Sequence, residues 1–96
     1  MERVLVIVRV ALDADRDHDR VRARCASDHE IAVCCVLPPG QSSLADVLQA
    51  QRATTASLRR LLGSAAERVA VFAASDREDD GVEACARAWG ATVVDV

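Results

Sequence analysis

Acidic side chains alternate with other residues over Asp13–Asp19, a spacing at which several carboxylates could bind calcium. A calcium-binding EF-hand loop needs Gly at its sixth position and Glu at its twelfth. Counted from Asp13, those positions hold His18 and Arg24. The sequence therefore favours a solvated turn with acids at a helix N-terminus, where the helix dipole stabilises negative charge. We assign no metal site.

Cysteines are the other potential metal ligands and nucleophiles. No C-x-x-C spacing occurs, so the usual structural zinc pattern is missing. Cys34 and Cys35 are neighbours in an apolar run, and neighbours on a strand point to opposite faces. Cys25 and Cys85 fall on apolar faces of expected helices. The sequence thus predicts four free thiols that pack in the core.

Catalytic residues are not recognisable. His18 and His29 stand in no acid–base motif, and the sequence shows no Ser/His/Asp set, paired catalytic carboxylates or P-loop. We therefore assign no reaction. The sequence leaves open whether the protein is an enzyme and favours a role without catalysis.

Arg9 is the most unusual residue, because it interrupts the apolar run Val4–Val10 near its carboxyl end. One interpretation is a contact with an anionic ligand. The other is an ion pair with a packed aliphatic stem, its partner being Asp13, Asp76 or Asp95.

Four apolar runs rich in β-branched residues predict the strands that must position these side chains. They are Val4–Val10, Ile31–Leu37, Arg68–Ala74 and Thr92–Val96.

Helical periodicity predicts three helices, at about Asp17–Ala26, Ser43–Gly63 and Asp80–Gly90. In the second, Ser43 is expected to cap the start and Gly63 to end the helix. Its apolar stripe comprises Leu44, Val47, Leu48, Leu58, Leu61 and Leu62.

Strands that alternate with helices indicate an α/β fold of the order β-α-β-α-β-α-β. We expect a single domain over residues 1–96, with a small open parallel sheet of about four strands and helices on both faces. A hydrophobic fraction of 51% with a net charge of −3 excludes disorder. Without a basic stripe, nucleic-acid binding is not expected. No run is long enough to span a membrane, and the start lacks a signal-peptide pattern, so we expect a cytoplasmic protein.

Three stretches together resemble the universal stress protein family. VLVIVRVALD (Val4–Asp13) resembles its first strand and the acidic turn after it. HEIAVCCVLPPG (His29–Gly40) resembles the second strand and its exit. ASDREDDGVEACARAWGATVVDV (Ala74–Val96) resembles the third-strand exit, third helix and fourth strand. The resemblance implies the strand order 3-2-1-4.

The sequence departs from ATP-binding members of that family. Their G-x2-G-x9-G-[ST] loop follows the fourth strand, whereas this chain ends at Val96. Their strand-end Asp falls on Arg9, and only a shifted alignment places Asp13 there. We therefore expect a truncated member without the phosphate-binding loop and fifth strand.

The sequence predicts a nucleotide-independent module that acts through protein contacts in a stress response, with an unidentified protein partner. A homodimer is expected through Thr92–Val96, because an exposed edge strand tends to pair with another chain. A contact between helices is the alternative. The alternative is weak binding or hydrolysis of ATP or AMP at the strand carboxyl ends, near Arg9, Asp13, Val36 and Leu37. Against it, Asp95 and the terminal carboxylate of Val96 are expected to repel phosphate.

Overall fold

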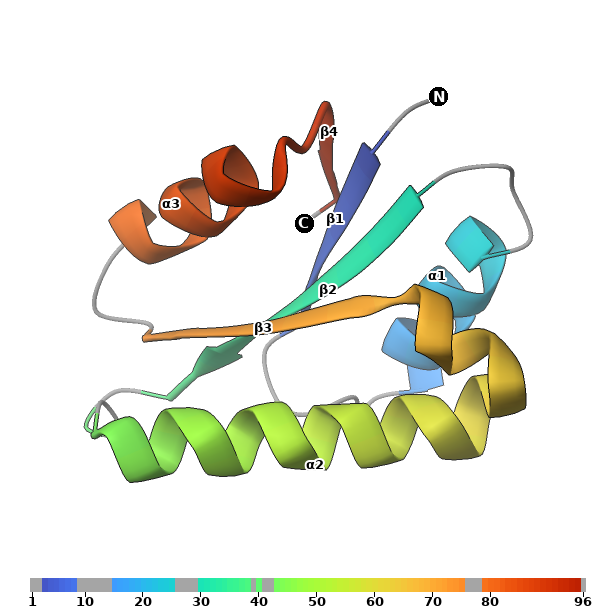
Figure 1. Cartoon of the computed structure of the whole chain (residues 1–96), viewed down its shortest axis with the longest axis horizontal. Helices are drawn as coiled ribbons and strands as arrows, with labels where there is room; N and C mark the ends of the chain where they lie inside the picture. The colour runs from blue at the N-terminus through green and yellow to red at the C-terminus, as the bar shows by residue number, and fades with distance from the viewer. Residues whose placement is uncertain are drawn as a thin grey trace.

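The computed structural model describes residues 3–8, 15–25, 30–38, 40, 43–75 and 79–95, without the side chains at 15–18, 75, 79 and 80. Its centre is one parallel sheet with the strand order β3-β2-β1-β4 (Figure 1). The strands are β1 (Arg3–Val8), β2 (Glu30–Leu37), β3 (Ala70–Ser75) and β4 (Val93–Asp95). The α/β class, the parallel sheet and its predicted order are confirmed.

Three α-helices connect the strands. They are α1 (Asp15–Cys25), α2 (Leu44–Leu62) and α3 (Asp79–Trp89), and the 3-10 helix η1 (Gly63–Arg68) follows α2. The predicted helices are confirmed to within about two residues at their described ends. The prediction for the third strand was wrong at its start. The Val69 N–H donates to the Ala66 carbonyl at the end of η1, so β3 begins only at Ala70.

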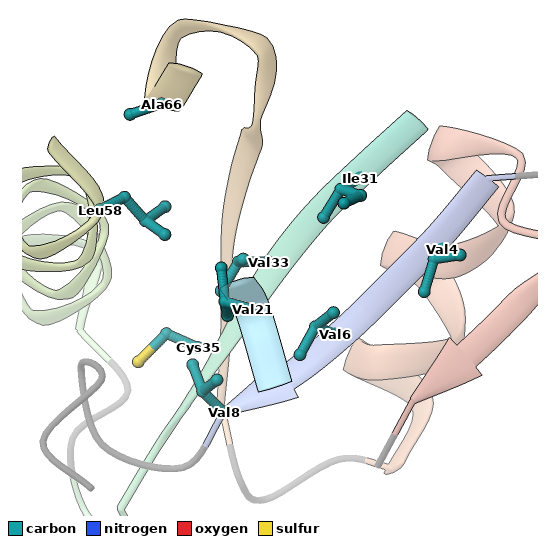
Figure 2. Packing of buried hydrophobic residues seen from close by; sticks show 9 residues of the cluster. All are labelled: Val4, Val6, Val8, Val21, Ile31, Val33, Cys35, Leu58 and Ala66. Carbon is teal, nitrogen blue, oxygen red and sulfur yellow. The ribbon is translucent and has the colours of Figure 1, made fainter. Parts of the chain in front are cut away.

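Side chains alternate across the sheet and divide the core into two layers. Val4, Val6 and Val8 of β1 pack on the face that α1 and α2 cover, where they meet Val21 and Leu58 (Figure 2). The intervening Leu5 and Ile7 face α3 with its Cys85 and Trp89. The expectation of helices on both faces is confirmed.

The two neighbouring cysteines follow this alternation. Cys35 lies in the layer under α1 and α2, and Cys34 lies in the layer under α3. All four cysteines are free thiols in the structure, and Cys25 and Cys85 pack against opposite layers. The prediction of opposite faces and core packing is confirmed.

Both ends of α2 are capped as expected. The Ser43 hydroxyl accepts a hydrogen bond from the Asp46 N–H at 3.1 Å. At the other end, the Gly63 N–H donates to the Arg59 carbonyl, and Gly63 has φ 62° and ψ −132°. This backbone conformation strongly favours glycine, because a Cβ would strain it.

The apolar stripe assigned to α2 was partly wrong. Leu44 is 75% exposed and Leu48 44%, whereas Thr54 and Leu58 are buried. A helix of 19 residues is about 28 Å long. The six residues of β3 span only about 20 Å. The first turns of α2 therefore extend beyond the strands it packs against (Figure 1).

None of the helices in the described part of the chain combines the length and the apolar character needed to cross a bilayer.

Candidate functional site

The strand order reverses at β1, which lies between β2, the next strand in the chain, and the sequence-distant β4. In open parallel sheets, ligands bind beyond the strand carboxyl ends at such a point. The carboxyl ends of β1 and β4 therefore form the candidate site. Asp95, the last described residue of β4, lies opposite Val6 in the β1–β4 register.

Arg20 of α1 bridges the ends of these two strands. One guanidinium nitrogen, Nη1, donates to the Ile7 carbonyl at 3.2 Å. The other, Nη2, donates to the Asp95 carbonyl at 2.8 Å and to its carboxylate Oδ1 at 3.3 Å. A single side chain thus holds α1 against both β1 and β4.

Arg24 completes the cluster from the next turn of α1. Its Nε donates to Asp95 Oδ2 at 3.0 Å, so each carboxylate oxygen meets a different arginine. Burial alone would raise the pKa of Asp95. The hydrogen bonds and positive charges of Arg24 and Arg20 outweigh this effect and hold that pKa below its usual range.

This arrangement corrects the expected role of Asp95. We predicted that the Asp95 charge would repel phosphate and named Arg9 as a possible ion-pair partner, but the carboxylate is paired with the two guanidinium groups of Arg20 and Arg24. Arg20 and Arg24 are separated by four residues and therefore lie on one helix face. We call Arg20, Arg24 and Asp95 the strand-end clamp, because these residues hold α1 against the switch point, the place between β1 and β4 where the strand order reverses.

The residues predicted to contact a nucleotide are only partly described. Arg9 and Asp13 lie outside the described residues, as do His29 and Asp76. Val36 and Leu37 are 3% and 2% exposed, since their side chains belong to the core. These two side chains could not contact a ligand without opening the core.

A second charged contact lies at the opposite, amino end of the sheet. Arg3 Nε forms an ion pair with Glu30 at 2.7 Å, and Nη1 donates to the Trp89 carbonyl at 2.6 Å. The guanidinium also stands 5.6 Å from the centre of the Trp89 ring. These contacts tie β1 to β2 and to the C-terminus of α3, so they are structural.

The buried thiol of Cys34 is held in its unreactive, protonated form. Burial, followed by the charge and hydrogen bond of Cys85, raises the pKa of Cys34 to about 12. Since the thiolate is the reactive form, Cys34 is a poor nucleophile at neutral pH. Among the described side chains, no group of three or more His, Cys, Asp or Glu residues could hold a metal ion.

Sequence reasoning missed the strand-end clamp. The available signal was two arginines spaced by four residues, on either side of the apolar Val21, together with one acid in an otherwise apolar final strand. Scans against protein-family models, curated proteins and solved structures find no match to this chain.

Proposed function

We propose that this chain is a nucleotide-independent module of the universal stress protein type, which acts through protein contacts and pairs with a second copy through β4. The supporting observation is the difference between the two edges of the sheet. An uncovered edge presents backbone groups that can pair with another strand.

The β4 edge carries little cover. In the described part of the chain, β4 pairs with β1 alone, and Val94 at its centre is 42% exposed. The β3 edge differs, because α2 lies along it (Figure 1) and Gln51 Nε2 donates to the Val71 carbonyl at 2.9 Å. A second sheet would therefore join at β4 more readily than at β3.

Independence from nucleotide is supported by the described residues at the switch point. The guanidinium groups of Arg20 and Arg24 are engaged with Asp95, and Arg20 also binds two strand-end carbonyls. A phosphate group would have to compete with these contacts. Calorimetric titration with ATP and AMP should show no saturable binding below about 1 mM, which corresponds to roughly −4 kcal/mol. A stoichiometric micromolar site would contradict this part of the proposal.

Light scattering over a dilution series tests the dimer. We expect the mass of a dimer at high micromolar concentration and of a monomer after dilution. Val94→Lys should abolish the dimer, because a charge at an edge strand opposes pairing. Leu44→Lys is the matched control, since Leu44 is exposed on α2, away from β4. A wild-type protein that stays monomeric at high micromolar concentration would refute the dimer.

A further inference from the structure

Two adjoining hollows of about 430 and 320 Å³ lie along α2 and share Gln51, Thr55 and Arg59. The first follows the outer face of α2 from Leu48. The second reaches η1 and the edge strand through Val69 and Val71. We call the two together the α2–β3 groove. Each is in the range of volumes that ligand pockets occupy.

The wall formed by β3 offers a backbone acceptor at the edge of the sheet. The Val71 carbonyl binds the side-chain amide of Gln51 at 2.9 Å. This amide takes the place of the N–H that a neighbouring strand would donate. Since α2 stands beside β3, a whole second sheet is excluded, and a single extended segment would have to lie in the second hollow, along Val69 and Val71.

The wall formed by α2 is positively charged. Arg52 and Arg59 are exposed, line the first hollow and lie seven residues apart, so they share one helix face. In the described part of the chain, neither forms an ion pair. The groove contains one acid, Glu67. Its cations are therefore complementary to carboxylates on a ligand.

We propose that the α2–β3 groove binds a short, extended peptide segment with acidic side chains, taken from a protein partner. A peptide N–H replaces the Gln51 amide at the Val71 carbonyl, and the peptide adds one strand to the β3 edge. Its carboxylates pair with Arg52 and Arg59, and an apolar side chain packs on Leu48. The inference rests on the proposed function because it supplies the partner surface of a protein-contact module, separate from the β4 edge.

Fluorescence anisotropy with labelled peptides tests this surface. The probe is an N-acetylated, C-amidated hexapeptide of alternating Val and Glu. One comparison peptide replaces Glu by Lys, and another carries N-methyl groups at alternate backbone amides. We expect saturable binding of the Glu peptide alone, because the Lys peptide meets like charges and the methylated peptide lacks strand N–H donors.

Variants of the protein locate the binding. Arg59→Ala should weaken the Glu peptide about threefold, as expected for an exposed charge pair. Gln51→Ala should tighten it about threefold, because the peptide no longer displaces an internal hydrogen bond. Arg60→Ala is the matched control, since Arg60 is exposed on α2 but lines neither hollow. Circular dichroism verifies that each variant folds.

The proposal would be overturned if the Glu peptide does not bind at up to 1 mM, or if the Lys or methylated peptide binds as tightly as the Glu peptide. It would also be overturned if free glutamate competes as well as unlabelled Glu peptide, or if Arg59→Ala and Arg60→Ala lose the same affinity for the Glu peptide. Peptide binding that persists in Val94→Lys shows that the groove acts independently of the dimer. A wild-type chain that binds the peptide but stays monomeric refutes β4 pairing alone, and a wild-type dimer that binds no peptide refutes the groove alone.

Discussion

At the scale of single residues, Asp95 links β4 to α1 through contacts that the sequence does not indicate. It lies in a three-residue strand, yet it meets two arginines of α1. The described apolar anchors of that helix are Val21 and the half-buried Cys25. The ion pairs therefore add to the apolar contacts that attach α1 to the sheet.

Asp95→Asn should lower the free energy of unfolding by about 1–2 kcal/mol at pH 7, since charge-assisted hydrogen bonds are weakened. Urea denaturation measures this loss. Asp19→Asn is the control and should have little effect, because Asp19 is exposed on α1.

The same carboxylate predicts a pH dependence. Because the pKa of Asp95 is lower in the folded protein, its stabilisation is complete above about pH 4, the usual unfolded value. It is lost as the pH falls through the folded value. Asp95→Asn should remove this part of the acid-induced loss, and an unchanged acid profile would contradict the assignment.

Thr54 is a residue whose burial works against stability. It is fully buried on α2, and its hydroxyl has no hydrogen-bond partner among the residues that the structure describes. Thr54→Val should raise the free energy of unfolding by about 1 kcal/mol, because an unsatisfied polar group leaves the core. Thr55→Val should give no gain, since the Thr55 hydroxyl already donates to the Gln51 carbonyl. Equal effects of the two substitutions in urea denaturation would refute this account.

At the scale of elements, the junction of α2 and η1 depends on Gly63. Gly63→Ala should cost about 1–3 kcal/mol, because an alanine is strained at φ 62° and ψ −132°. The cost is conformational, since an added Cβ would meet no atom of the described residues within 4 Å. Ser64→Ala, at an exposed neighbouring position, should change stability little. A thermal melt compares the two, and a neutral Gly63→Ala would show that the turn relaxes.

The elements themselves could be predicted because their patterns are local. The apolar runs and the caps at Ser43 and Gly63 are properties of neighbouring residues, and they placed the strands and α2. The exposure of Leu44 and Leu48 could not be predicted, because it depends on how far α2 extends beyond the sheet.

The candidate site was harder to predict than the fold, because it joins residues about 70 positions apart. The separations of Arg20 and Arg24 from Asp95 are 75 and 71 positions. The path of the chain between the strands places α1 beside β4. Only that placement makes Arg20 and Arg24 the charge partners of Asp95. Val36 and Leu37 were correctly placed near a strand end, but periodicity alone did not show that their side chains are buried.

At the scale of the whole molecule, the open four-stranded sheet has two edge strands, β3 and β4. The β3 edge has α2 and the Gln51 amide beside it. The β4 edge has the half-exposed Val94. This asymmetry underlies both proposals, a second copy at β4 and a single peptide strand at β3.

Disulfide trapping at Val94 tests the central claim most directly, because it reports both the dimer and its location. If two β4 strands pair antiparallel about their centres, Val94 lies opposite its own copy, within reach of a disulfide. Val94→Cys with a mild thiol oxidant should yield a covalent dimer on a non-reducing gel. The wild-type chain and Leu44→Cys should run as monomers on the same gel, because their dimer is not covalent. Failure of Val94→Cys to cross-link, or equal cross-linking of Leu44→Cys, would contradict pairing through β4.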